Sequence, residues 1–263
     1  FVLRHGRVGR CQDLFNHTAL INFLFKILSF VTNFSIIIPV YNESNNIEEL
    51  VLEIFNSLSI YKNYEIIIID DGSNDNSINV IKNLKKKYPV ELIEHHENLG
   101  QSQSIYTGIK NSSSKTIVTL DGDGQNNPKD IPKLLEIYFS SNNLALVSGI
   151  RIKRKDNLIK IISSRIANTI RSYILEDNCP DTGCSLKVFR KNVFLSFPYF
   201  DGIHRFIPAL FSGYGEKTQF ISVEHRPRMK GVSNYGIFDR LFKGIYDLFR
   251  VKRIINQYKK SNE

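Results

Sequence analysis

Short apolar segments alternate with amphipathic ones along residues 34–150, and this alternation most constrains the fold. Residues 34–39 and 64–69 are dominated by isoleucine, as is typical of parallel strands that are buried on both faces. Residues 45–58, between them, have apolar side chains at helical spacing. The same rhythm predicts an α/β fold with a doubly wound, mostly parallel, Rossmann-like sheet. Further strands are expected at residues 90–94, 115–120 and 144–150, and further helices at 75–87, 102–110 and 128–139.

The pattern changes after residue 150. We expect a helix over residues 157–175, strands over 181–190 and 217–224, and a basic amphipathic helix over 237–255. Two interpretations of the last helix stay open, packing on the sheet and lying at a membrane interface. Its apolar residues are Phe238, Leu241, Phe242, Ile245, Leu248 and Phe249, and its basic residues are Arg240, Lys243, Arg250, Lys252 and Arg253.

Residues 1–33 form an N-terminal extension to this pattern. Three arginines precede a mainly apolar stretch over residues 14–31, which superficially resembles a signal peptide. Polar residues interrupt the stretch, so it is a poor transmembrane helix, and no small-residue cleavage site follows it. Two hypotheses stay open: an interfacial helix, or upstream sequence that is not native, with translation beginning near Val31.

The charge and cysteine content narrow the classes of partner. A formal net charge of +9 over 263 residues calls for an anionic partner. No nucleic-acid-binding motif accompanies the charge, so phosphates and an anionic membrane surface are favoured over nucleic acid. The three cysteines form no C-x-x-C motif, which indicates a reducing compartment and no structural zinc. Neither a G-x-G-x-x-G fingerprint nor a P-loop is present.

Two carboxylates, Asp121 and Asp123, lie two residues apart directly after the strand predicted at 115–120. Hard oxygen ligands at this spacing suit Mg²⁺ or Mn²⁺, which keeps coordination sites for substrate phosphates. Gly122 and Gly124 carry no side chain to stop the backbone approaching a ligand. The alternative is an ordinary acidic Asp-Gly turn.

Four loops of polar residues are expected at one edge of the sheet, because the carboxyl ends of parallel strands meet there. Tyr41 is placed to lie against a nucleobase, Asp71 to accept a hydrogen bond from a base or ribose, and the two carboxylates to hold a metal diphosphate. The four loops are residues 39–43, 70–73, 121–125 and 149–151.

With these motifs the chain resembles the family-2 glycosyltransferases of the GT-A fold. The likeness rests on residues 37–43 (IIPVYNE), 69–75 (IDDGSND) and 120–128 (LDGDGQNNP). Within that family it is most similar to the polyprenyl-phosphate glycosyltransferases of the dolichyl-phosphate mannose synthase type. The narrower likeness rests on residues 147–151 (VSGIR), 181–190 (DTGCSLKVFR), 204–206 (HRF) and 225–236 (HRPRMKGVSNYG).

The resemblance implies a nucleotide-sugar-binding half over residues 34–150 and an acceptor-binding half over 151–263. It implies a nucleotide pocket, a site for the donor diphosphate and its metal, and cations for the donor and acceptor phosphates, with catalysis resting on Asp121, Asp123, Arg151 and Arg228. The nucleotide-pocket residues would be Pro39, Tyr41, Glu43, Ile69 and Asp71, the diphosphate residues Asp121, Gly122 and Asp123, the metal ligands Asp121, Asp123 and Gln125, and the phosphate-binding cations Arg151, Arg165 and Arg228.

The implied reaction is a single inverting transfer of a hexose, of mannose or glucose type, from a GDP- or UDP-sugar to polyprenyl or dolichyl phosphate. A phosphomonoester has a second pKa of about 6, so the acceptor is already anionic and needs no general base. His204 and His225 are accordingly interpreted as structural or phosphate-contacting residues. Asn234 stands where the family commonly has a lysine, which removes one expected cation. The enzyme would be peripheral, at the cytoplasmic face of a membrane.

Two other functions stay open at this point. The same fold could transfer the sugar to a glycan or lipid hydroxyl group, which would require a general base. A non-catalytic sugar-nucleotide-binding scaffold at the membrane is the other possibility, although the intact Asp121, Asp123 and Gln125 argue against it. The Q-x-x-R-W motif of processive enzymes is absent, which weakens a polymerase function.

Overall fold

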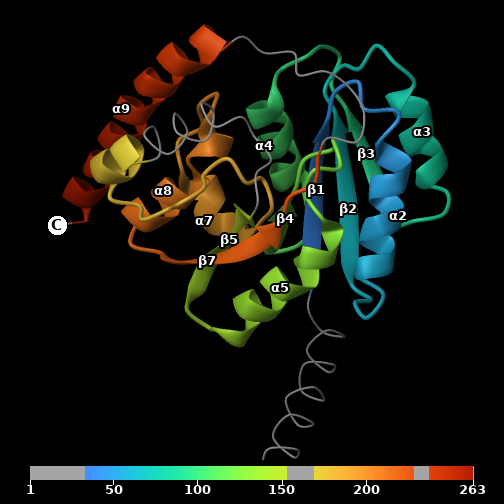
Figure 1. Ribbon diagram of the computed structural model, residues 1–263, viewed down its shortest axis with the longest axis horizontal. Helices are drawn as coiled ribbons and strands as arrows, with labels where there is room; N and C mark the ends of the chain where they lie inside the picture. Colours follow the sequence, from blue (N-terminus) through green and yellow to red (C-terminus); the bar gives the residue numbers. More distant parts are fainter. Residues whose placement is uncertain (1–32, 153–168, 228–236, 263) are drawn as a thin grey trace, which may run out of the picture.

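A seven-stranded sheet forms the centre of the protein, in the order β3-β2-β1-β4-β6-β5-β7 (Figure 1). The structure is a computed structural model that describes residues 33–152, 169–227 and 237–262, with the backbone alone for residues 152 and 237–243. Only β6 runs against its neighbours, so the expected mostly parallel, doubly wound sheet is confirmed. The strands are β1 (Phe34–Val40), β2 (Tyr64–Asp70), β3 (Val90–Glu94), β4 (Thr116–Thr119), β5 (Leu144–Ile152), β6 (Lys187–Arg190) and β7 (Lys217–Glu224).

Helices cover both faces of the sheet, as the two-sided burial of its central strands requires. One face carries α2 (Ile47–Ser57), α3 (Ser77–Leu84) and α5 (Ile131–Ser140), which follows the 3₁₀ turn η1 (Pro128–Asp130). The other face carries α4 (Gln101–Asn111), a helix over 169–175, α7 (Lys191–Ser196), α8 (Ile207–Gly213) and α9 (Ile237–Ser261), with the 3₁₀ turn η2 (Ile203–Arg205) before α8.

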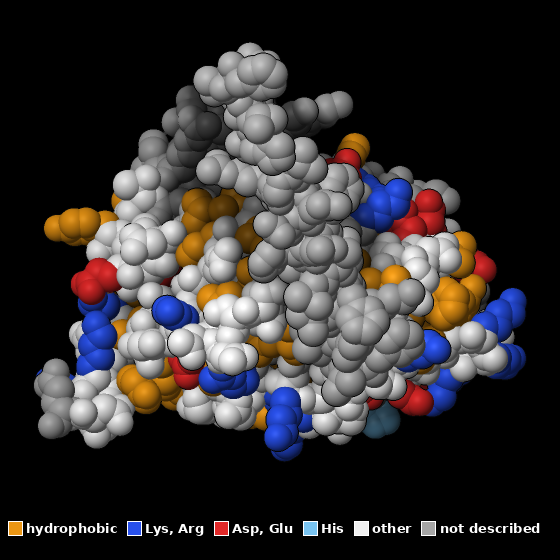
Figure 2. Space-filling view, turned by 90° about the horizontal axis from the view of Figure 1, so that it is seen from below, with side chains coloured by type: hydrophobic (Ala, Val, Ile, Leu, Met, Phe, Trp, Pro, Cys, Tyr) orange, Lys and Arg blue, Asp and Glu red, His pale blue; other side chains and the backbone are white. Residues whose placement is uncertain are grey.

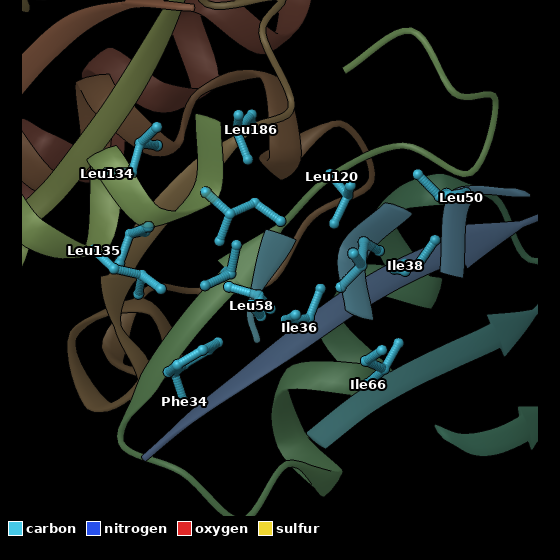
Figure 3. Close-up of a cluster of buried hydrophobic side chains, with 14 of the residues drawn as sticks. Phe34, Ile36, Ile38, Leu50, Leu58, Ile66, Leu120, Leu134, Leu135 and Leu186 are labelled. Atoms are coloured by element: carbon cyan, nitrogen blue, oxygen red, sulfur yellow. The ribbon is translucent and has the colours of Figure 1, made fainter. Parts of the chain in front are cut away.

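The alternation of side chains along β1 and β2 divides the apolar core into two clusters. Phe34, Ile36 and Ile38 point to the cluster beneath α2 and α5, which Figure 3 shows from within. Ile37 and Ile67 point to the opposite cluster beneath α4 and α8. Because successive strand residues face opposite sides, an uninterrupted apolar run supplies both cores at once. This is why β1 and β2 were recognisable as buried strands in the sequence.

The strands and helices expected over residues 34–150 are all present, with ends shifted by a few residues. The boundary expected at residue 150 falls inside β5, and β6 and β7 of the second half complete the same sheet. The strand expected over 181–190 was too long, because only Lys187–Arg190 pair with β4 and β5. The short helices between residues 191 and 213 were not expected at all.

Helix α9 is packed against the core along one face, as the first of its two interpretations predicts; the membrane interface stays a prediction. Leu248, Val251 and Ile255 are buried in the core beneath α8, so one face of the helix is packed. Ile245 and Phe249, which the sequence pattern places on the same apolar face, are instead 47% and 63% exposed. Among the helices in the described part of the chain, none has the length and apolar character needed to cross a bilayer. The extension over residues 1–32 lies outside the described residues.

The two ends of the strands carry different residues. Strands β1, β2 and β4 run in the same direction, and the loops with the candidate site residues follow their carboxyl ends. Figure 2 views the protein from below and therefore shows the edge at which β1 begins. On the coloured part of that view the Lys and Arg side chains are scattered and form no single patch.

Close packing of α4 on the sheet gives a test of this arrangement. A Cβ atom at Gly108 would lie 2.5 Å from Ile69 Cδ1 and 2.6 Å from Ile37 Cγ2, whereas one at Gly244 of α9 would meet no atom within 4 Å. We expect Gly108→Ala to lower the free energy of unfolding by about 1–3 kcal/mol through overpacking. Gly244→Ala, the matched control, should raise it by up to about 1 kcal/mol through helix propensity. Urea denaturation measures both, and equal effects would contradict the packing described.

Candidate active site

The three principal loops of the site lie side by side because β1 is paired with β2 on one side and with β4 on the other. The backbone amide of Asp71, after β2, donates to the carbonyl oxygen of Val40 at 2.8 Å. The amide of Leu120, after β4, donates to the carbonyl oxygen of Ile37 at 3.4 Å. The predicted meeting of these loops at one edge is therefore what the fold produces.

The loop after β1 is held to the loop after β2 by side-chain to backbone hydrogen bonds. Ser73 Oγ accepts from the amide of Asn42 at 2.9 Å, and Asn42 Oδ1 accepts from the amide of Asn74 at 2.8 Å. Glu43 is turned towards α2, where its carboxylate accepts from Asn46 Nδ2 at 2.5 Å. Tyr41 remains 37% exposed, so its ring is accessible to a ligand at this edge.

Asp71 has a more structural environment than its sequence motif suggested. Its carboxylate is buried and accepts the backbone amides of Leu99 at 3.1 Å and Gly100 at 2.8 Å, which fixes the loop that leads into α4. His95 Nδ1 lies 2.7 Å from Asp71 Oδ1, and His95 Nε2 lies 3.2 Å from Thr107 Oγ1. Sequence reasoning missed this histidine, because only the fold brings it to Asp71.

Asp121 and Asp123 are close enough to repel each other. Burial, together with the charge of Asp123, raises the pKa of Asp121 from 3.8 to about 6, while the charges of Lys187 and Arg151 oppose the rise. Gln101, at the start of α4, donates to Asp121 Oδ1 at 2.7 Å and orients the carboxylate. Two partly desolvated carboxylates of this kind favour a divalent cation, which would relieve their repulsion.

The donor set itself is small. Among the residues that the structure describes, no group of three or more His, Cys, Asp and Glu side chains is placed to hold a metal ion. A cation at Asp121 and Asp123 would therefore need further ligands from an amide, from water or from substrate phosphate, which is usual for Mg²⁺. The two carboxylates fit a substrate-dependent metal site, and they do not form a closed structural one.

The glycines of this loop serve its packing. A Cβ at Gly122 would lie 3.0 Å from the carbonyl oxygen of Pro39, so the glycine lets the loop pack against the end of β1. Gly124 has a φ of 74°, which lies in the left-handed region that favours glycine. Behind the loop, the buried Asn126 accepts from Ser185 Oγ at 2.6 Å and from the amide of Asp121 at 3.3 Å.

Arg151 is near the site but already engaged. Its Nε and Nη2 atoms donate to the two carboxylate oxygens of Asp181 at 2.8 Å each, in a mostly buried bidentate pair. An arginine has five N–H donors, and within the described part of the chain the pair with Asp181 uses two of the side-chain donors. Lys187, at the start of β6, is buried, and burial lowers its pKa; its ammonium group donates to the carbonyl oxygen of Cys184. Lys187 was not among the predicted site residues.

The remaining predicted residues divide into three groups. Pro39 and Ile69 are paired with each other near the carboxyl ends of β1 and β2, directly before the loops of the site. Arg165, Arg228 and the substituted position Asn234 lie outside the described residues. Gln125 lies in the loop after Asp123, whose Oδ1 accepts from the amide of Gln125 at 3.0 Å. The roles of these residues in binding stay predictions.

Comparison with known proteins identifies the family. The sequence profile described as Glycosyl transferase family 2 matches residues 35–196, which cover β1 to β6 and the loops described above. The chain belongs to this family. The resemblance noted in the sequence is thereby confirmed.

Curated relatives of the chain extend the match. A dodecaprenyl-phosphate galacturonate synthase of Rhizobium johnstonii is 34% identical over 223 residues, which are 82% of this chain and 65% of that protein. An undecaprenyl-phosphate 4-deoxy-4-formamido-L-arabinose transferase of Edwardsiella ictaluri is 32% identical over 227 residues, 85% of this chain and 68% of that protein. The chain thus spans about two thirds of the length of these family members.

Solved structures of glycosyltransferases show the same GT-A fold. Glucosyl-3-phosphoglycerate synthase of Mycobacterium tuberculosis in complex with phosphoglyceric acid superposes with a TM-score of 0.67 at 15% identity, over 88% of this chain and 83% of that one. The complex of the same enzyme with UDP superposes with a TM-score of 0.65 at 14% identity, over 96% of this chain and 87% of that one. At this identity the likeness concerns the fold of the family.

The raised pKa of Asp121 predicts a pH-dependent stability. The folded protein holds this proton more tightly than the unfolded chain, so the contribution of the neutral carboxyl group is full below pH 3.8 and is lost as the pH rises through about 6. Asp121→Asn cannot ionise. We therefore expect the metal-free variant to be more stable than the parent protein at pH 7.5, with a difference that shrinks towards pH 4. Urea denaturation across this range measures it, and a difference independent of pH would contradict it.

Proposed function

We propose that this protein transfers a sugar from a nucleotide sugar to a polyprenyl phosphate. The observation that carries the proposal is the convergence of the Tyr41, Asp71 and Asp121–Asp123 loops at adjacent strand ends. Relatives that match more than four fifths of the chain are named as sugar transferases or synthases for dodecaprenyl and undecaprenyl phosphate. Their names support the acceptor class, and the site supports the donor class.

The donor would lie across the three loops. We infer that the base binds beside Tyr41 and that the diphosphate lies at Asp121 and Asp123 with Mg²⁺ or Mn²⁺. The cation would supply positive charge to the leaving diphosphate. The similarly folded glucosyl-3-phosphoglycerate synthase was crystallised with Mn²⁺ and UDP, which supports a divalent cation here. Gln101 keeps the Asp121 carboxylate oriented before the donor binds.

The acceptor chemistry agrees with the side chains of the site. A phosphomonoester is anionic at neutral pH, so it can attack the anomeric carbon without a general base. His95 has one ring nitrogen against Asp71 and the other against Thr107, and its side chain is only 8% exposed. The N–H donors of Arg151 outside its pair with Asp181 are suited to orient a phosphate. Arg165 and Arg228 stay predicted phosphate contacts.

A membrane-facing surface is the second part of the proposal. The helix over 169–175 and α9 lie side by side, joined by an ion pair of 3.2 Å between Lys252 and Glu176 (Figure 1). Large apolar side chains on both helices are exposed, with Tyr173 at 86%, Tyr246 at 64% and Phe249 at 63%. Basic side chains accompany them on α9, where the Arg250 guanidinium lies 5.0 Å from the centre of the Tyr246 ring. Aromatic and basic residues together suit the interface of an anionic bilayer.

A transfer assay tests the reaction. The protein is incubated with undecaprenyl phosphate and labelled GDP- and UDP-sugars, including mannose, glucose and galacturonate donors, with and without Mn²⁺ or Mg²⁺. We expect one donor to give a lipid-linked product only when the metal is present. Transfer to a glycan hydroxyl group instead, or no lipid-linked product from any donor, would refute the proposal.

The role of Asp123 gives a sharper test. We expect Asp123→Asn to lower the transfer rate by about 10²-fold, because it removes a charge that would hold the cation against the diphosphate. Glu216→Gln is the control, since Glu216 pairs at 3.8 Å with Arg190, whose strand meets β4 at the end away from the site. Unchanged transfer in Asp123→Asn would remove this residue from the metal site.

The membrane surface has its own test. We expect the double variant Tyr246→Ser, Phe249→Ser to bind phosphatidylglycerol-containing vesicles about tenfold more weakly, because two exposed aromatic rings no longer enter the interface. Leu52→Ser with Ile60→Ser is the matched control, because these side chains are 44% and 47% exposed on and beside α2. Co-sedimentation measures both. An equal loss in the control would mean that general surface hydrophobicity is responsible.

A further inference from the structure

The chain that leaves β7 is paired with the loop that follows Asp123. Asn126 and His225 form an isolated antiparallel bridge. The amide of Arg226 donates to the carbonyl oxygen of Gln125 at 2.9 Å, and Gln125 Nε2 donates to the carbonyl oxygen of Arg226 at a longer 3.5 Å. Gln125 is therefore bonded to Arg226 through both its backbone carbonyl group and its side-chain amide.

The side chain of Arg226 anchors this pairing to a third segment. Its Nη1 atom lies 2.8 Å from each carboxylate oxygen of Glu53, and its Nη2 atom donates to Asn127 Oδ1 at 2.6 Å. The side chains of Arg226 and Glu53 are only 22% and 26% exposed, so water screens this pair less than a surface pair. Glu53 lies on α2, the helix that follows the Tyr41 loop.

The orientation of the Gln125 amide has a chemical consequence. A carboxamide offers a metal its oxygen and offers a carbonyl group its N–H donors. With Nε2 directed at Arg226, the oxygen is the end of the Gln125 side chain that can serve a cation beside Asp123. A loop that slips relative to residue 226 would lose this orientation together with the position of Asp123, whose Oδ1 accepts the Gln125 amide.

We propose that Arg226 is a positioning residue for the donor site, which holds the Asp123–Asn127 loop to Glu53 of α2 and presents the oxygen of Gln125 to the diphosphate-bound cation. The identity of the ligand in this inference rests on the proposed function. The contacts of Arg226 with Glu53, Asn127 and Gln125, which we call the clamp, are present in the metal-free protein and do not depend on that function. The backbone pairing sets the register of the loop, and the guanidinium fixes the pairing in place.

The clamp is tested first without any ligand. Hydrogen–deuterium exchange is followed in metal-free Arg226→Met, Glu53→Gln and the conservative Arg226→Lys. Arg190→Met is the matched control, because it breaks the arginine–glutamate pair with Glu216, beside the start of β4 and so at the end of the strands away from the site. We expect faster exchange over residues 121–127 in the Met and Gln variants, a smaller effect in Arg226→Lys, and none in this loop in Arg190→Met. Unchanged exchange in both Arg226→Met and Glu53→Gln would overturn the proposal.

Cation binding is tested separately. The electron paramagnetic resonance signal of free Mn²⁺ is titrated with each variant in the presence of UDP. We expect the dissociation constant of Mn²⁺ to rise about tenfold in Arg226→Met and Glu53→Gln, as for other residues that orient a metal ligand. Partial rescue in Arg226→Lys and an unchanged value in Arg190→Met are expected.

The two measurements separate the possible failures. Values within twofold of the parent protein in both Arg226→Met and Glu53→Gln, despite faster loop exchange, would leave Arg226 a merely structural residue and overturn the proposal. A parent protein that binds no Mn²⁺ with UDP would refute the donor chemistry of the proposed function, and with it the presentation of Gln125 to a cation. The exchange results would still decide whether the clamp exists.

Discussion

The burial of β1 on both faces and along both edges is the constraint on which the site depends. Its apolar side chains supply both halves of the core, so the strand is held by packing on both faces as well as by its two neighbouring strands. Pairing with β2 and β4 then brings three acidic or polar loops to adjacent positions. The positions of the site loops are thus a consequence of strand pairing, because each loop follows directly from one of the paired strands.

Burying the carboxylates of the acidic loops is unfavourable, and several hydrogen-bond and charge partners offset that penalty. Asp121 has Gln101 against one oxygen and the charges of Lys187 and Arg151 nearby. Asp71 is satisfied by two backbone amides and by His95. Because these carboxylates are already oriented, they need little rearrangement when a cation or a base binds, and less free energy is lost to reorganisation.

Much of this was predictable from the sequence, for physical reasons. Runs such as residues 64–69 specify buried strands by themselves, and Asp-Gly pairs after them mark the loops at the strand ends. The short helices α7 and α8 have six and seven residues, too few for a clear helical period, and were missed. Ion-pair partners were also beyond prediction: Arg226 and Glu53 are 173 positions apart, and only the folded sheet brings them together.

The reversed strand β6 makes the two halves of the chain interdependent during folding. Hydrogen bonds on one side of β4 are satisfied by β6, which comes about seventy residues later, after β5 has been made. Until β6 pairs with it, β4 (Thr-Ile-Val-Thr) is an open edge, the kind of β-branched strand that invites pairing with another molecule. The insertion of β6 is therefore also a safeguard against aggregation, and a chain cut after β5 would lose it.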